Sequence, residues 1–302
     1  MFRFTLKQLL YFRVVADQGG IAQAARQLNV AQPSVAQALE KLEDLTGLVL
    51  LERHHARGVS LTAQGRHFLA QAESLLDHAE QVVREAAALA AEEAGEIRLG
   101  CFPTIAAFYL PGLIRSHRKA HPGTRITAEE TTMDLLASRT RAGSLDLCLT
   151  YDVADTLEGL NVHRLLSVAP RVLLPSRHPK ARAGSVRLSE LADEPYVMFD
   201  APGSREYFTG LLDDAGLSPE IAYASQSLEG VRSAVGAGFG FSVAALLPGQ
   251  NKTYEGNGIS VVALKGQIRS LDIVLASRRT GRENTLVTRF VDHARQHMTT
   301  AD

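Results

Sequence analysis

The sequence predicts an α/β protein in three parts: a small helical domain, one long helix and a two-lobed α/β body. Three observations support this prediction. Residues 20–43 contain two short helical patterns joined by a tight turn, and residues 62–93 form one unbroken helical pattern. From residue 95 onward, short β-like runs alternate with helical runs, which is typical of a parallel sheet with crossover helices.

The charge of the chain is divided unevenly along its length. The 302 residues suffice for two or three compact units, and 45% hydrophobic with 22% charged residues is an ordinary globular balance. Residues 1–70 hold eight Lys and Arg against five Asp and Glu, a charge of +3, so the net charge of −1 leaves −4 for the rest. A basic N-terminal part (the head, residues 1–70) followed by an acidic remainder (the body) suits nucleic-acid binding by the head.

Nothing in the sequence indicates export or a membrane segment. The N-terminal run MFRFTLKQLL is too short and charged too early for a signal peptide, and no stretch of about 18 apolar residues exists. The two cysteines, Cys101 and Cys148, do not make a secreted disulfide framework. Both lie in strand-like runs, which favours buried structural thiols over a redox switch. We therefore expect a cytoplasmic protein.

The N-terminal domain is expected to contain three helices and a wing. The first helix covers residues 5–18 with Thr5 as N-cap, and the second covers residues 21–28. The third begins at Pro33, which suits the first helical position, and Gly47 ends it. A short strand at residues 48–51 and a wing hairpin at residues 53–60 follow. Neighbouring side chains diverge on a strand, so the adjacent histidines of the wing are not expected to bind a metal.

The third helix has two different faces. Val35, Leu39 and Leu42 form one apolar stripe. The opposite side carries short hydrogen-bonding groups and one cation, supplied by Ser34, Gln37 and Lys41. Such side chains suit contacts with base edges and phosphates in a DNA major groove. On periodicity alone, an ordinary amphipathic helix pair is the alternative.

Three motifs in sequence order resemble the N-terminal domain of LysR-type transcriptional regulators. They are LKQLLYFRVVADQGG, AQPSVAQALEKLED and LLERHHARGVSLTAQG. The resemblance implies a winged helix-turn-helix domain at residues 1–64 that binds double-stranded DNA. The residues expected to contact DNA are Gln32, Pro33, Ser34, Gln37, Lys41, Arg53 and Arg57, the two arginines through phosphates or the minor groove. The family often has Ser where this chain has Ala31, so the operator sequence does not carry over.

The long helix carries a heptad seam, which is typical of helix pairing. Its members alternate by three and four: Leu69, Ala72, Leu76, Ala79, Val83, Ala86 and Ala90. Packing on its own domain is the alternative, but the head offers no other element large enough to cover the helix. We therefore expect residues 65–94 to pair with a second copy, giving at least a dimer. The resemblance further implies that the protein forms a tetramer and contacts RNA polymerase.

The body, residues 95–302, is expected to be two α/β lobes. Strands are expected at residues 96–101, 125–130, 143–151, 171–175, 196–199, 221–224 and 270–276. Helices are expected up to residue 120, with an interruption at Pro111, and at residues 134–141, 204–215, 228–235 and 284–298. Crossings near residues 167–171 and 265–271 give lobe I (95–167 and 271–302) and lobe II (168–270).

Further motifs extend the resemblance across the body. The strings AHPG, GSLDL and GAGFGFSVAALLP look like those of the LysR family and imply a periplasmic-binding-protein-like effector domain. The run GAGFG follows a helix rather than a strand, so a dinucleotide-binding loop is not favoured.

Helix starts between the lobes are the expected ligand site. Four of them carry a hydroxyl or amide, and free N–H groups at helix starts suit anions. Ordinary N-capping explains any one of them, whereas their joint position matches the effector cleft of the family. We expect a small organic anion, a carboxylate, with no cofactor or metal. The expected contacts are Thr104, Thr132, Ser204 and Gln226, with Arg205 as counter-charge and Phe102 and Phe199 as an apolar wall.

The sequence thus predicts a LysR-type DNA-binding transcriptional regulator whose promoter binding is modulated by an effector held between two lobes. A solute-binding transport protein is the second reading, opposed by the basic head and the missing export signal. An enzyme is the third. The chain has no Gly-x-Ser-x-Gly elbow, P-loop or paired histidine–glutamate motif, and Asp146, Asp152 and Asp155 are scattered rather than paired.

Overall fold

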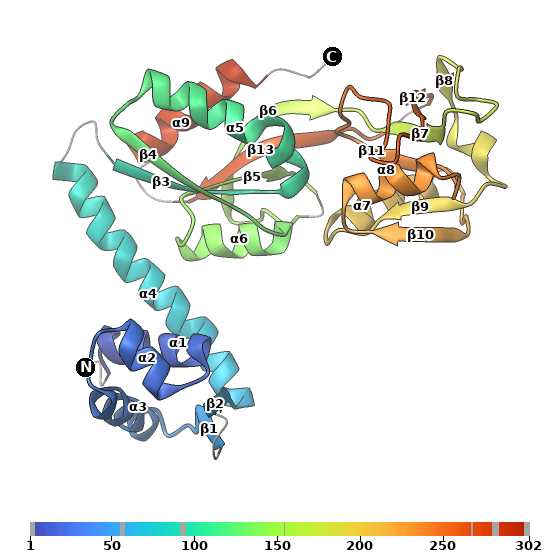
Figure 1. Cartoon of the computed structure of the whole chain (residues 1–302). Helices are drawn as coiled ribbons and strands as arrows, with labels where there is room; N and C mark the ends of the chain where they lie inside the picture. Colours follow the sequence, from blue (N-terminus) through green and yellow to red (C-terminus); the bar gives the residue numbers. More distant parts are fainter. Residues whose placement is uncertain are drawn as a thin grey trace. The chain divides into compact units, whose positions relative to one another are not determined.

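The structure is a computed structural model of the chain (Figure 1). It describes residues 4–54, 58–90, 95–153, 155–266, 268–279 and 284–298. The chain divides into two compact units, one made mainly of Met1–Ala90 and the other of Ala91–Arg141 and Leu145–Asp302. Among the described helices, none combines the length and apolar character that crossing a membrane requires.

The first unit contains a helical cluster and a β-hairpin. Its elements are α1 (Leu6–Gln18), α2 (Ile21–Gln27), α3 (Gln32–Thr46), β1 (Leu51–His54), β2 (Gly58–Leu61) and α4 (Ala63–Ala90). Thr5 caps α1 through a capping box with Gln8, in which each side chain bonds the other residue's backbone N–H. Gly47 ends α3 at φ 69°, a left-handed conformation that glycine adopts without strain.

A separate hydrophobic core holds this unit together. Phe12 of α1 and Val35 of α3 are fully buried, and Ala72 and Leu76 of α4 are 3% and 6% exposed in the same cluster. Helix α1 therefore packs on the first half of the long helix, and these two members of the expected heptad seam face the head rather than a second copy. Further along, Val83 is 69% exposed. The side chains of Ala86 and Ala90 lie outside the described residues.

The segment after α3 is not the expected strand. Strand β1 begins only at Leu51, and it pairs antiparallel with β2 from Leu51 opposite Leu61 to His54 opposite Gly58. The preceding residues are tied to α3 instead. The Glu43 carboxylate accepts the backbone N–H groups of Leu50 and Leu51 at 2.7 and 3.2 Å, and Leu50 is buried.

The first lobe of the second unit is a five-stranded sheet with helices on both faces. Its elements are β3 (Gly95–Cys101), α5 (Pro103–Ala120), β4 (Thr124–Glu130), α6 (Met133–Ala142), β5 (Leu147–Tyr151), β6 (Leu160–Val168), β13 (Leu271–Arg278) and α9 (Thr285–His297). The strand order is β4-β3-β5-β13-β6. Strands β4, β3 and β5 are parallel, and β13 is antiparallel to both neighbours. Helices α5 and α9 cover one face and α6 the other (Figure 1).

The second lobe lies between two passages of the chain. Its elements are β7 (Arg171–Pro175), β8 (Ser185–Val186), the 3-10 helix η1 (Leu188–Leu191), β9 (Tyr196–Phe199), α7 (Ser204–Asp214), β10 (Ile221–Ser225), α8 (Leu228–Gly236), β11 (Ser242–Ala244) and β12 (Ile259–Leu264). One sheet has the order β11-β7-β12-β8, and β9 and β10 form a parallel pair. The chain enters this lobe between β6 and β7 and leaves it between β12 and β13.

Helix α5 corrects one expectation from the sequence. Pro111 lies inside this helix, which continues unbroken from Pro103 to Ala120. Proline removes one backbone hydrogen bond to the carbonyl four residues earlier. Pro111 and Ala107 are both exposed, so water can reach the carbonyl group that loses its partner.

Candidate functional site

Helix α3 presents one polar face to solvent. Val35, Leu39 and Leu42 are 0%, 3% and 0% exposed, so the apolar stripe is packed in the core of the first unit. The five residues of α3 predicted to contact DNA are exposed: Gln32, Pro33, Ser34, Gln37 and Lys41. The helix begins one residue earlier than expected, at Gln32, so Pro33 occupies the second position, where its missing N–H also costs no hydrogen bond.

The wing hairpin is fastened to the turn between α1 and α2. The backbone N–H of Val59 donates to the carbonyl of Gly19 at 2.9 Å. Gly58 has φ 86°, and a Cβ atom there would come within 2.2 Å of the same carbonyl oxygen. The two predicted wing contacts are not located: the Arg53 side chain and the whole of Arg57 lie outside the described residues.

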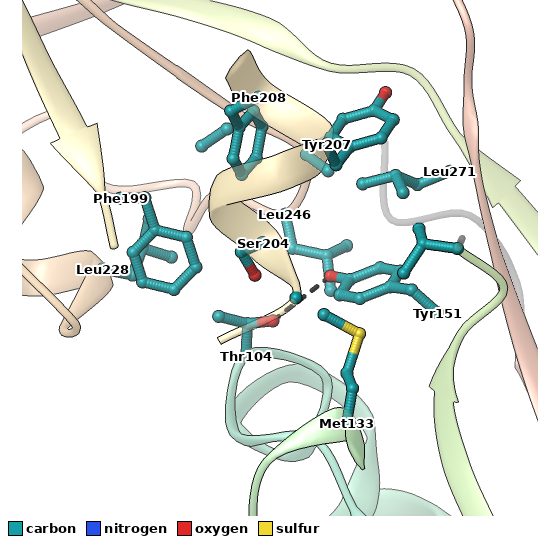
Figure 2. A pocket seen from close by; sticks show the side chains of 14 residues that line it. Thr104, Met133, Tyr151, Phe199, Ser204, Tyr207, Phe208, Leu228, Leu246 and Leu271 are labelled. Carbon is teal, nitrogen blue, oxygen red and sulfur yellow. Dashed lines mark hydrogen bonds between the residues drawn. The ribbon is translucent and has the colours of Figure 1, made fainter. Parts of the chain in front are cut away.

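The second unit contains a pocket lined by the starts of four helices (Figure 2). Thr104 is the second residue of α5, while Met133, Ser204 and Leu228 are the first residues of α6, α7 and α8. The other lining residues are Tyr151, Val153, Phe199, Gly203, Tyr207, Phe208, Ala244, Ala245, Leu246 and Leu271. The empty space is about 390 Å³, its open side included.

Three of the seven predicted ligand residues line this pocket, and four do not. Thr104, Phe199 and Ser204 belong to its wall. Thr132 is the residue before α6, and its carbonyl accepts the N–H of Leu136 at 2.9 Å. Gln226 is exposed before the N-cap of α8. The remaining expected wall residue, Phe102, is buried outside the lining with its ring edge-on to Tyr151.

Arg205 does not supply the expected counter-charge in the pocket wall. Its guanidinium pairs with the carboxylate of Asp200, and both side chains are partly exposed. Hydrogen bonding to Arg205 lowers the pKa of Asp200, and the same bond raises the pKa of Arg205. The described residues that line the pocket include no charged side chain.

The polar groups of the pocket are hydroxyls. The Oγ1 of Thr104 lies 3.3 Å from the hydroxyl of Tyr151, the dashed contact in Figure 2. Burial raises the pKa of Tyr151 above its usual value, so this phenol stays neutral. The Tyr207 hydroxyl donates to the backbone carbonyl of Arg269, and burial raises the pKa of Tyr207 to about 12.

Both lobes contribute to the pocket. Gly203, in the second lobe, has φ 83°, and a Cβ atom on it would lie 2.5 Å from Cε of Met133, in the first lobe. A larger residue at position 203 would therefore displace the Met133 side chain. Leu271, where the chain returns to the first lobe, also lines the pocket.

Most of the pocket wall was not identified from the sequence. Tyr151 ends β5, so its position at the carboxyl end of a parallel strand was a usable signal. Tyr207 follows Ser204 by three residues, one turn along α7. Ala244, Ala245 and Leu246 come from β11 and the residues after it, and that strand was not expected.

Other candidate sites have structural explanations. Cys101 and Cys148 are buried as expected, and burial raises the pKa of Cys148 to about 11. Gly236 ends α8, and a Cβ atom on Gly240 would lie 2.0 Å from the carbonyl oxygen of Pro195, so the GAGFG run forms a close structural turn. Within the described parts of the chain, no three His, Cys, Asp or Glu side chains are arranged to hold a metal ion.

Two family descriptions match the chain, one for each unit. Residues 6–66 match the bacterial regulatory helix-turn-helix protein, lysR family, and residues 90–299 match the LysR substrate binding domain. The HTH-type transcriptional regulator YnfL of Escherichia coli (strain K12) is 33% identical over 79% of this chain and 81% of its own. ClcR of Pseudomonas putida is 29% identical over 78% of this chain and 81% of its own.

Solved structures agree with the fold. HinK, a LysR family transcriptional regulator from Pseudomonas aeruginosa, has 34% sequence identity and a TM-score of 0.65, covering 97% of this chain and 98% of its own. Full-length CbnR complexed with its target DNA has 24% identity and a TM-score of 0.72, with 97% and 99% covered, and shares the fold. With both units matched, the chain belongs to the LysR family of transcriptional regulators.

Proposed function

We propose that this regulator binds operator DNA through α3 and responds to a small molecule held in the pocket of its second unit. The observation that carries the proposal is the pocket built from both lobes, with Met133 of one against Gly203 of the other. A ligand shifts an equilibrium between two arrangements only if it binds them with different affinity. A ligand that contacts both lobes meets this condition.

The DNA contacts follow from the exposed face of α3. Gln37 and Ser34 would read base edges in the major groove, and Lys41 would contact a phosphate. Arg53 and Arg57 of the wing would add phosphate or minor-groove contacts. The CbnR structure, described as a complex with its target DNA, supports this use of the fold.

Self-association would place two such heads on one operator. Val82 and Val83 are exposed on α4, and apolar side chains on a long helix suit pairing with a second copy. Two heads would then read two half-sites, as symmetric operators require. A tetramer and contact with RNA polymerase are further parts of the proposal that rest on the family.

The effector would be a small organic molecule with one carboxylate. The first turn of a helix leaves backbone N–H groups without intrahelical partners, and these suit an anion. The hydroxyls of Thr104 and Ser204 lie at two such starts. Because Arg205 is paired with Asp200, the carboxylate would be held by neutral donors alone.

The proposal is tested by sequencing the genomic DNA fragments that the purified full-length protein retains. We expect enrichment of a few promoter regions with paired half-sites, and loss of that enrichment in Gln37→Glu, because a carboxylate there repels the DNA backbone. Gln71→Glu, with the same change at an exposed position of α4, is the matched control. Identical fragment profiles for the two variants would rule out α3 as the reading element.

A further inference from the structure

The side chains that line the pocket of the second unit are mostly apolar, and none of those described is charged. We propose that its ligand is a compact, largely apolar ring compound with at most one charged group. Polyanions and polyhydroxylated molecules are excluded. This inference rests on the proposed function and specifies the ligand class of the same pocket.

Aromatic rings from two elements, β9 and α7, make part of the apolar wall. Phe199, Tyr207 and Phe208 are each about 5% exposed. The rings of Phe208 and Tyr207 meet edge-on with centroids 5.2 Å apart, and Phe208 meets Phe199 at 6.3 Å. The thioether of Met133 lies on the other side of the pocket (Figure 2). Rings and thioethers make favourable contacts with a further ring, so this wall suits a ring better than a flexible polar chain.

The wall cannot compensate several charges. Burying an ion costs several kcal/mol unless it is paired and hydrogen-bonded. The described lining has no charged side chain, and Arg205, the cation expected there, is paired with Asp200. The helix starts with Thr104 and Ser204 can serve one anionic or polar group. A second carboxylate would find no charged side chain in the described lining to pair with.

The hydroxyls are also too few for a sugar-like ligand. The lining contains four, and the Tyr207 hydroxyl already donates to the carbonyl of Arg269. The hydroxyls of Thr104 and Tyr151 contact each other. A molecule with many hydroxyls would bury most of them without partners, at a cost for each.

Calorimetric titration of the full-length protein tests the inference with four probes: benzoate, benzyl alcohol, citrate and glucose. We expect both ring probes to bind and neither polar probe to do so. Ala245→Phe fills the pocket and should weaken ring binding by about tenfold or more, equivalent to about 1.4 kcal/mol. Ala263→Phe makes the same change at an exposed position of β12 outside the pocket and should leave binding unchanged. Arg205→Ala should also bind the ring probes normally.

Three results would overturn the inference: tighter binding of citrate or glucose than of the rings, no binding of either ring probe at millimolar concentration, or loss of benzoate binding in Arg205→Ala. DNA retention measured on the same protein separates this failure from failure of the proposed function. Retained operator DNA whose binding responds to a polar ligand would leave the regulator standing and refute the ring preference. Protein that binds the ring probes but retains no DNA would support the ring preference and refute the proposed DNA-binding function.

Discussion

The buried imidazole of His117 makes the stability of the second unit depend on pH. His117 lies on α5, fully buried, and neither ring nitrogen has a hydrogen-bond partner in the described part of the chain. Burial lowers its pKa from 6.5 to about 4, with smaller contributions from His121, His293 and Arg289. Protonation would place a positive charge between α5 and α9, beside groups that are themselves basic.

The sign of the effect follows from which state binds the proton first. Between pH 6.5 and about 4 the unfolded chain takes up a proton at this imidazole and the folded chain does not, so stability falls as the pH falls. Below both values this group causes no further loss. Acidification from about pH 7 to about pH 4.5 therefore removes about 2.5 kcal/mol of unfolding free energy through His117 alone. His293, whose pKa is also lowered by burial, acts in the same direction.

Denaturant unfolding at both pH values, followed by far-UV circular dichroism, measures this loss. His117→Phe removes the titrating group and keeps a ring against Phe290, whose centroid is 5.0 Å away. The variant should lose about 2.5 kcal/mol less than the native protein on acidification. His67→Phe, at an exposed position of α4, should keep the native dependence. The reasoning is refuted if His117→Phe and the native protein lose the same free energy.

Three further predictions concern DNA, coupling and the first core. Gln37→Ala should reduce the discrimination between operator sequences by about 1–3 kcal/mol. Lys41→Ala should instead weaken binding to all DNA sequences and lower the slope of log affinity against log salt concentration by about 1. Fluorescence anisotropy titrations at several salt concentrations check both. Tyr207→Phe should leave ring-probe affinity within about threefold but change the response of DNA binding to that probe, since it loses only the bond to the carbonyl of Arg269. Leu42→Ala, at a fully buried position, should destabilise the first unit by about 2–5 kcal/mol, measured by thermal unfolding.

The helices of the first unit could be predicted because their signals are local. Thr5 caps α1, Gly47 ends α3, and the stripe from Val35 to Leu42 repeats at helical spacing. The strand after α3 was predicted to start too early, because Leu50 is apolar but lies before β1, and its N–H donates to the Glu43 carboxylate. The burial of Ala72 and Leu76 depends on how α1 and α4 cross, which periodicity does not give.

The sequence indicated where a pocket would lie, but it did not indicate that the side chains lining the pocket are mostly apolar and uncharged. Helix starts have sequence signals, so Thr104 and Ser204 could be named from the sequence. The apolar wall depends on which side chains converge in three dimensions, and Met133 and Tyr207 gave no separate signal. Arg205 was expected to pair with an anionic ligand because it lies at a helix start. Its guanidinium instead forms an ion pair with Asp200, five residues earlier in the chain.

The contacts around the pocket also suggest why a ligand there would affect the whole second unit. Tyr207 contributes its ring to the pocket and its hydroxyl to the carbonyl of Arg269, two residues before β13 returns the chain to the first lobe. The Arg269 guanidinium also lies over the Tyr207 ring, 5.7 Å from its centroid. A ligand that moves this ring would therefore move a passage between the lobes.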